Sequence, residues 1–190
     1  MVKNRPTVAL FGGSFDPPHK GHQAIVKKLA ALNDIDKLII MPAFLNPLKE
    51  ETWASASQRL EWCRRVCSGP RVIVSDYEIT QGKPVYTIET IKALQKEYAV
   101  KYLVIGSDNL KEIEKWHKFE RLNEMISWLV FTRGKEKPDC RKLKHYKVLG
   151  LDMPVSSTEI RNGVALDQVD GCILHEVNHT ITHFKDNNDH

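Results

Sequence analysis

The chain has 190 residues, 42% of them hydrophobic, and its 28 basic against 24 acidic residues give a net charge of +4. This apolar content suits one ordinary core, so residues 1–190 are expected to form a single domain. A slight basic excess suits an anionic substrate but does not indicate a strongly polyanionic partner. No stretch approaches the about 18 consecutive apolar residues of a membrane span, and the start lacks a cleavable signal pattern, so we expect a cytoplasmic protein.

The cysteines show no paired CxxC spacing, which argues against a structural zinc site and against a disulfide framework. We expect reduced thiols that mostly pack in the interior. They are Cys63, Cys67, Cys140 and Cys172.

Six apolar runs of strand length alternate with segments of helical period. The runs are continuous rather than alternating, which is typical of strands covered on both faces. The expected strands are Thr7–Phe11, Lys37–Met41, Arg71–Ser75, Tyr102–Ile105, Trp128–Thr132 and Lys147–Leu151. The expected helices are Gly21–Leu32, Ser57–Val66, Thr87–Tyr98 and, in pieces, Asn109–Met125.

Strand and helix alternating at this spacing predict an α/β fold, a doubly wound parallel sheet with helices on both faces. A closing helical segment follows, and residues 185–190 are expected to fray. Ligands of such sheets bind beyond the carboxyl ends of the strands, where the strand order reverses. Chemically unusual residues should therefore follow the strands and share one rim. They are Gly12–His22, Pro42–Lys49, Tyr86 and Thr87, Gly106 and Asp108, Arg133, and Ser156–Arg161.

The stretch LFGGSFDPPHKGH, Leu10–His22, predicts a phosphate site. Gly12 and Gly13 follow a buried strand, so the backbone can turn and approach a ligand closely. Two prolines stiffen the loop, and a helix then begins whose first amides and dipole favour an anion. His19 and His22 are three residues apart, so both imidazoles lie on one side of the first turn. Neither a P-loop nor a G-x-G-x-x-G fingerprint is present.

Together with the second motif SSTEIR, Ser156–Arg161, this stretch resembles the nucleotidyltransferase superfamily with an HxGH motif. YTIET at 86–90 and GSD at 106–108, followed by Trp116, resemble the bacterial nicotinate-nucleotide adenylyltransferase family more narrowly. The resemblance runs from Val8 to the helix after Arg161. It implies a Rossmann-like nucleotidyltransferase fold and transfer of the adenylyl group of ATP to nicotinate mononucleotide, with release of pyrophosphate, in NAD biosynthesis.

The resemblance also implies roles for residues at the adenylyl-donor end. His19, His22 and Arg161 are the expected catalytic residues, with the imidazoles stabilising charge around the α-phosphorus. The expected ATP-binding residues are Gly12, Gly13, Ser14, Phe15, His19, His22, Gly106, Asp108, Ser156, Thr158 and Arg161. Structural alternatives are a helix N-cap for Ser156 or Asp108 and a surface position for Arg161.

At the acceptor end the resemblance implies aromatic contacts to the pyridine ring from Tyr86 and Trp116, with core packing as their alternative. Thr87 would donate to the nicotinate carboxylate or cap its helix. Lys49 and Arg133 would hold the mononucleotide phosphate. The family usually has PPHK or PPHR where this chain reads NPLK at 46–49, so the basic residue is kept in a changed loop.

Such a transfer needs no strong base, because the attacking phosphate monoester is already an anion. Mg²⁺ is expected with ATP, held by phosphate oxygens and water, and no protein metal ligands are assigned. The expected partners are ATP and nicotinate mononucleotide, with no nucleic acid and no membrane, and a homo-oligomer is compatible with the sequence.

Parts of the sequence also match three other functions. HEVNH at 175–179, with His183 one turn further, matches the HExxH motif of zinc peptidases, but a closing helix with exposed histidines is the preferred interpretation. Whether this histidine stripe binds nickel or zinc adventitiously is left open by the sequence. Pantetheine-phosphate adenylyltransferase shares the HxGH logic but opens with a PGTFDP-like loop. The basic stretch at 141–147 could contact nucleic acid, but a solvated surface is the preferred interpretation.

Overall fold

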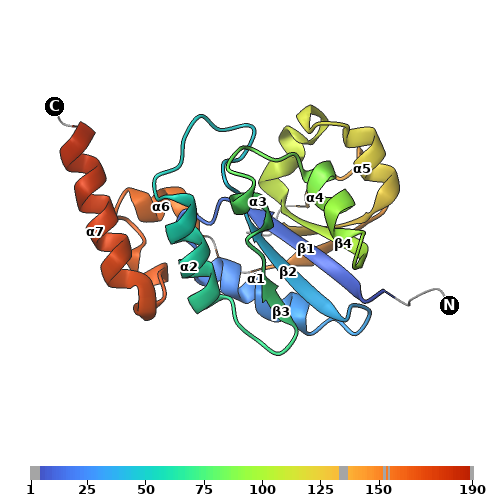
Figure 1. Cartoon of the computed structure of the whole chain (residues 1–190), viewed down its shortest axis with the longest axis horizontal. Coiled ribbons are helices and arrows are strands. Elements are labelled where there is room, and N and C mark those ends of the chain that lie inside the picture. Colours follow the sequence, from blue (N-terminus) through green and yellow to red (C-terminus); the bar gives the residue numbers. More distant parts are fainter. Residues whose placement is uncertain (1–4, 133–136, 152, 154, 189–190) are drawn as a thin grey trace.

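Six parallel strands form one sheet in the order β3-β2-β1-β4-β5-β6. Figure 1 shows the first four of these strands side by side. The computed structural model describes residues 5–132, 137–151, 153 and 155–188. The strands are β1 (Thr7–Gly13), β2 (Lys37–Pro42), β3 (Val72–Val74), β4 (Ala99–Gly106), β5 (Ser127–Thr132) and β6 (Tyr146–Gly150). The order reverses between β1 and β4, as in a doubly wound sheet, which confirms the predicted fold class.

The helices fall close to the predicted segments. They are α1 (Lys20–Ala30), α2 (Ala56–Val66), α3 (Tyr77–Thr80), α4 (Thr87–Leu94), α5 (Phe119–Met125), α6 (Ser157–Arg161) and α7 (Gly171–Asn188), with 3₁₀ turns η1 (Ser107–Lys111), η2 (Ile113–Lys115) and η3 (Leu166–Gln168). The expected helix in pieces over 109–125 is η1, η2 and α5. One short helix, α3, was not predicted. The tail that we expected to fray begins within α7, whose backbone stays helical to Asn188.

Side chains of the central strands alternate between two cores, one on each face of the sheet. Phe11 of β1 belongs to the core beneath α1, α2 and α7, and Leu10 to the core beneath α4 and α5. Figure 1 shows these helices on opposite sides of the sheet. Burial on both faces explains why β1, β2, β4 and β5 are continuously apolar.

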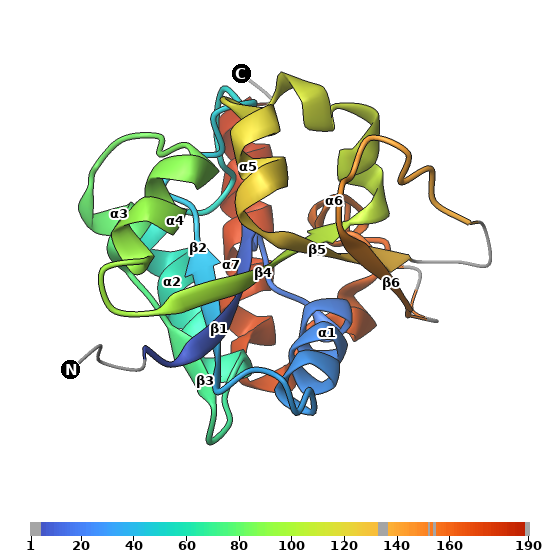
Figure 2. The ribbon, with the colours of Figure 1, turned by 90° about the vertical axis from the view of Figure 1, so that its right-hand side faces the viewer.

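The expectation that all six strands are covered on both faces was wrong for β6. This strand lies at one edge of the sheet, away from β3 at the other (Figure 2). Tyr146 is 49% exposed and Val148 42% exposed. The apolar run KVLGL indicated a strand correctly, but composition alone does not distinguish a central from an edge position.

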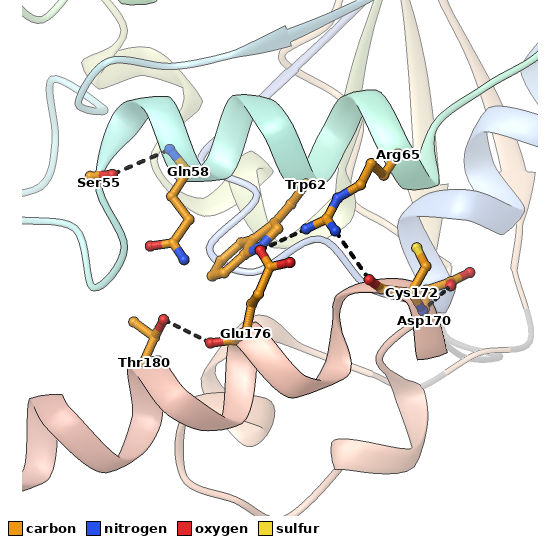
Figure 3. Close-up of polar contacts among 8 residues, drawn as sticks. All are labelled: Ser55, Gln58, Trp62, Arg65, Asp170, Cys172, Glu176 and Thr180. Carbon is orange, nitrogen blue, oxygen red and sulfur yellow. Dashed lines mark hydrogen bonds and ion pairs between the residues drawn. The ribbon is translucent and has the colours of Figure 1, made fainter.

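Helix α7 packs against α2 through a small polar network at their interface (Figure 3). The Glu176 carboxylate accepts hydrogen bonds from the buried Trp62 Nε1 at 2.9 Å and from the Arg65 guanidinium at 2.6 Å. Arg65 also donates to the Cys172 carbonyl at 3.2 Å. The hydrogen bonds from Arg65 and Trp62 lower the pKa of Glu176, so a charged acceptor fixes the closing helix to the domain.

Candidate functional site

A cleft of about 380 Å³ opens at the carboxyl ends of the strands, on the switch point between β1 and β4. The motifs predicted to share this rim line the cleft together. They are represented there by Gly12, Gly13, Ser14, Phe15, His22, Lys49, Tyr86, Thr87, Gly106, Asp108, Trp116, Ser156, Thr158 and Arg161. Arg133 lies outside the described residues. Gly12 and Gly13 do not follow β1 as expected but are its last two residues, paired with Met41 and Pro42 of β2.

The two motif histidines form a reciprocal cap at the start of α1. Nδ1 of His19 accepts from the backbone N–H of His22 at 3.4 Å, and Nδ1 of His22 accepts from the N–H of His19 at 3.2 Å. Their rings are stacked with centroids 3.7 Å apart. Because each Nδ1 is an acceptor, the proton of each neutral ring lies on Nε2, which is thereby a donor. His22 lines the cleft, whereas His19 is only 3% exposed.

Gly21 makes this stack sterically feasible. A Cβ at Gly21 would lie 2.9 Å from two ring atoms of His19 and 2.8 Å from Cγ1 of Val155. The glycine between the histidines is therefore required by the packing of His19 beneath the helix start, rather than by an unusual backbone angle. At Gly106 a Cβ would lie 2.4 Å from the Asp108 carboxylate, so this glycine accommodates a side chain of the cleft wall.

The two motifs far apart in sequence are hydrogen-bonded to one another. Arg161 donates to the Asp16 carbonyl at 2.7 Å, and the Ser157 hydroxyl donates to the Pro17 carbonyl at 2.9 Å. Arg161 also donates to the Thr158 hydroxyl at 2.9 Å. Ser156 is the N-cap of α6, as its structural alternative proposed, and still lines the cleft. The SSTEIR segment is thus fixed to the loop that precedes α1.

The changed NPLK loop after β2 forms a local turn. The Asn46 side-chain carbonyl accepts from the Leu48 N–H at 2.9 Å, and its backbone carbonyl accepts from the Lys49 N–H at 2.8 Å. This turn holds Lys49 at the cleft. Desolvation and then the positive charge of Arg161 lower the pKa of Lys49, and the nearby Asp16 carboxylate opposes this shift.

Aromatic side chains gather at the α4 side of the cleft. Tyr86 occupies the N-cap position of α4, is 43% exposed and stacks on His117 with ring centroids 4.4 Å apart. Trp116 is half-buried, lines the cleft and packs edge-on against the core residue Trp128 at 6.1 Å. Both alternatives weighed for Trp116, core packing and a ligand contact, are therefore compatible with its position.

Glu78 lines the same cleft and was not singled out from the sequence. It is 8% exposed and accepts a hydrogen bond from the Thr90 hydroxyl at 2.6 Å. Burial raises the pKa of Glu78 to about 7, and the hydrogen bond from Thr90 opposes this shift. The partners are twelve residues apart on α3 and α4, so only the packing of these two helices brings them together. His117 was missed for a similar reason, since it follows a 3₁₀ turn without a motif.

The zinc-peptidase alternative does not fit the structure. The glutamate of HEVNH, Glu176, is committed to Trp62 and Arg65 in the α2–α7 interface (Figure 3). Within the described part of the chain no group of three or more His, Cys, Asp or Glu side chains could hold a metal ion. His179 and His183 do face each other, with Nε2 atoms 2.9 Å apart on the exposed surface.

The basic stretch at 141–147 is largely matched by acidic partners. Arg141 pairs with Asp139 at 2.6 Å, and Lys142 pairs with Glu114. Lys147 donates to the Tyr102 hydroxyl at 2.9 Å. This pairing favours a solvated surface over a phosphate-binding patch. No helix among the described residues has the length and apolar character needed to cross a bilayer.

Comparison with known proteins shows the family of the chain. Residues 10–163 match the family model described as cytidylyltransferase-like. A Sulfurovum sp. (strain NBC37-1) protein named "Probable nicotinate-nucleotide adenylyltransferase" is 48% identical over 180 residues, 94% of this chain and 96% of that protein. A protein of the same name from Sulfurimonas denitrificans is 46% identical over 165 residues, 86% of this chain and 88% of that protein.

The fold also matches a solved structure. Plasmodium falciparum nicotinic acid mononucleotide adenylyltransferase complexed with NaAD superposes with a TM-score of 0.72 at 21% identity, covering 96% of each chain. At that identity the match shows the fold alone. The family assignment depends on the relatives of higher sequence identity. The chain is a member of the nicotinate-nucleotide adenylyltransferase family, within the cytidylyltransferase-like nucleotidyltransferases.

Proposed function

We propose that this chain transfers the adenylyl group of ATP to nicotinate mononucleotide. A phosphate oxygen of the mononucleotide attacks the α-phosphorus of ATP, an O–P bond forms, the bond to the β-phosphate bridge oxygen breaks, and pyrophosphate leaves. The observation that carries the proposal is the meeting of the HxGH and SSTEIR motifs in one cleft at the switch point of the sheet. The family to which the chain belongs supplies the choice of substrates.

The donor half of the cleft suits a polyphosphate. With Nδ1 held by a backbone N–H, the His22 ring offers its Nε2–H as a donor, and His19 behind it keeps the ring in place. Arg161, Ser156 and Thr158 add a guanidinium and two hydroxyls. Donors held before the substrate arrives stabilise charge that develops on the α-phosphoryl group without reorganisation. Asp108 beside Gly106 is proposed to contact the nucleoside.

The acceptor half suits a flat ring that carries anions. Tyr86 and Trp116 offer ring faces to the pyridine, and Thr87 at the start of α4 offers a donor to its carboxylate. Lys49, which lines the cleft, is proposed to hold the mononucleotide phosphate. Arg133, outside the described residues, keeps the same proposed role from its place after β5.

Mg²⁺ is proposed to accompany ATP, because the donor set of this cleft fits an ion carried by phosphates rather than by a protein cage. The carboxylate of Asp16 near the motifs is already engaged by the backbone N–H groups of Trp53 at 2.7 Å and Ala54 at 2.9 Å. When bound, the ion would neutralise charge on the phosphate oxygens. A cytoplasmic location is proposed because ATP is available there.

An ATP-dependent pyrophosphate release assay across phosphate acceptors tests the function. We expect rapid release with nicotinate mononucleotide, slower release with nicotinamide mononucleotide, and none with phosphopantetheine. Equal use of acid and amide mononucleotides would contradict the preference for the acid, which a single carboxylate contact decides. Release with phosphopantetheine alone would replace the proposal by the pantetheine alternative.

A further inference from the structure

Arg59 is a charged side chain in the interior that no motif explains. It lies in the first turn of α2 and is 0% exposed. A buried guanidinium normally needs a carboxylate or several hydrogen-bond acceptors, since desolvating an unpaired charge is costly. Its partners are four backbone carbonyls, one from just before α2 and three from segments 15 to 45 residues earlier in the chain.

These carbonyls belong to the segments that build the cleft. One terminal nitrogen of Arg59 donates to the Ser14 carbonyl at 2.6 Å and to the Ala43 carbonyl at 2.7 Å. The other terminal nitrogen donates to the Phe44 carbonyl at 2.7 Å, and Nε donates to the Ala54 carbonyl at 3.2 Å. One planar group therefore connects the loop after β1, the loop after β2 and the entry to α2.

The positive charge of Arg59 also affects a residue that lines the cleft. Its positive charge is one of the causes that lower the pKa of Lys49, after burial and Arg161. Asp16, buried at 4% exposure, interacts favourably with Arg59 and keeps the pKa of that guanidinium from falling further under its desolvation. The buried cation thus adds positive potential beneath residues that face anionic ligands.

We propose that Arg59 is a positioning residue for adenylyl transfer, which sets the spacing between the HxGH loop and the Asn46–Lys49 turn. The inference rests on the proposed function, because these loops carry the proposed donor and acceptor sites. Lysine cannot replace arginine here, since a single ammonium cannot reach four carbonyls that a planar fork contacts from several directions.

The test compares Arg59→Lys and Arg59→Met with Arg64→Lys, a control on the same helix whose side chain is 47% exposed. Steady-state KM for ATP and for nicotinate mononucleotide is measured on folded protein selected by gel filtration and circular dichroism. We expect both KM values to rise about tenfold or more in the Arg59 variants and to stay unchanged in the control. A smaller folded fraction would lower the apparent kcat but would leave KM unchanged.

Unchanged KM values in folded Arg59→Lys would overturn the inference, provided that the wild type is active. Inactivity of the wild type on every acceptor would instead contradict the proposed function. Should neither Arg59 variant fold, hydrogen exchange of the wild type decides. We expect the backbone amides of peptides covering 14–16 and 43–46 to exchange slowly in the free enzyme. Rapid exchange there would reject Arg59 as a positioning residue.

Discussion

His19 and His22 cap the same helix start reciprocally, each ring accepting the backbone N–H of the other while the two rings stack at 3.7 Å. The histidine rings therefore have a structural role in capping the helix and a proposed role in catalysis. Nδ1 of each imidazole caps the helix, and Nε2 of His22, the histidine that lines the cleft, is the atom proposed to donate to a ligand. The two roles can be separated by substitution because they use different atoms of the ring.

His22→Asn keeps an acceptor near the position of Nδ1 but removes Nε2. We expect turnover to fall by two to three orders of magnitude, on the order of 3 kcal/mol of transition-state stabilisation, with a melting temperature close to that of the wild type. His22→Ala loses both roles and should additionally lose about 1 kcal/mol of stability. Stopped pyrophosphate assays and thermal melts measure the two effects, and near-normal turnover of His22→Asn would remove Nε2 from the mechanism.

Gly21→Ala tests the packing beneath the helix start. The added methyl group would lie 2.8 Å from Cγ1 of Val155 and 2.9 Å from the His19 ring. We expect at least a tenfold loss of kcat/KM and a destabilisation of about 1–3 kcal/mol, as for other overpacked sites.

Gly171→Ala is the matched control, because a Cβ there meets no heavy atom of the described residues within 4 Å. It should leave activity unchanged and stability unchanged or slightly raised. Comparable losses in both variants would show that the effect of Gly21→Ala is not steric.

Glu78 predicts a pH dependence of stability. Its pKa of about 7 in the folded protein lies above the ordinary 4.5, so the folded state holds this proton more tightly than the unfolded state. Protonated Glu78 therefore makes its full contribution to the free energy of unfolding below pH 4.5, and this contribution is lost as the pH rises through 7. A shift of this size corresponds to roughly 3 kcal/mol above pH 8.

Glu78→Gln should flatten the fall of the melting temperature between pH 5 and 8. Glu97→Gln, an exposed position, serves as the control and should keep the wild-type slope. If the melting temperatures of Glu78→Gln and the wild type fall equally between pH 5 and 8, Glu78 is ionised in the folded protein well below pH 7.

Glu176→Ala tests the structural role of the HExxH glutamate. The change leaves Nε1 of the fully buried Trp62 without its acceptor, which should cost about 1–3 kcal/mol of unfolding free energy, whereas Glu176→Gln keeps an acceptor and should cost less. KM for ATP should not change in either variant. Zinc-dependent peptide cleavage by the wild type that is lost in both variants would revive the peptidase alternative.

Much of the candidate site could be predicted because its residues belong to motifs that are contiguous in the sequence. A buried apolar run followed by Gly12 and Gly13, a rigid loop and two histidines three residues apart predicts a phosphate-binding element from one contiguous stretch. Glu78 and Arg59 carry no such signal. Thr90, the partner of Glu78, belongs to another helix, and three of the four carbonyls that Arg59 contacts belong to the loops after β1 and β2. The sequence around Glu78 or Arg59 does not indicate these contacts.

The order of apolar runs and helical segments by itself determined the parallel doubly wound sheet and the edge at which ligands would bind, because right-handed crossovers leave few other arrangements. Tertiary structure alone decided that Arg161 bonds to the Asp16 carbonyl 145 residues away, that β6 is an exposed edge, and that the HExxH glutamate fixes α7 to α2. Such contacts depend on the packing of whole elements, and a periodic pattern specifies which face of an element is buried but not which residue it meets.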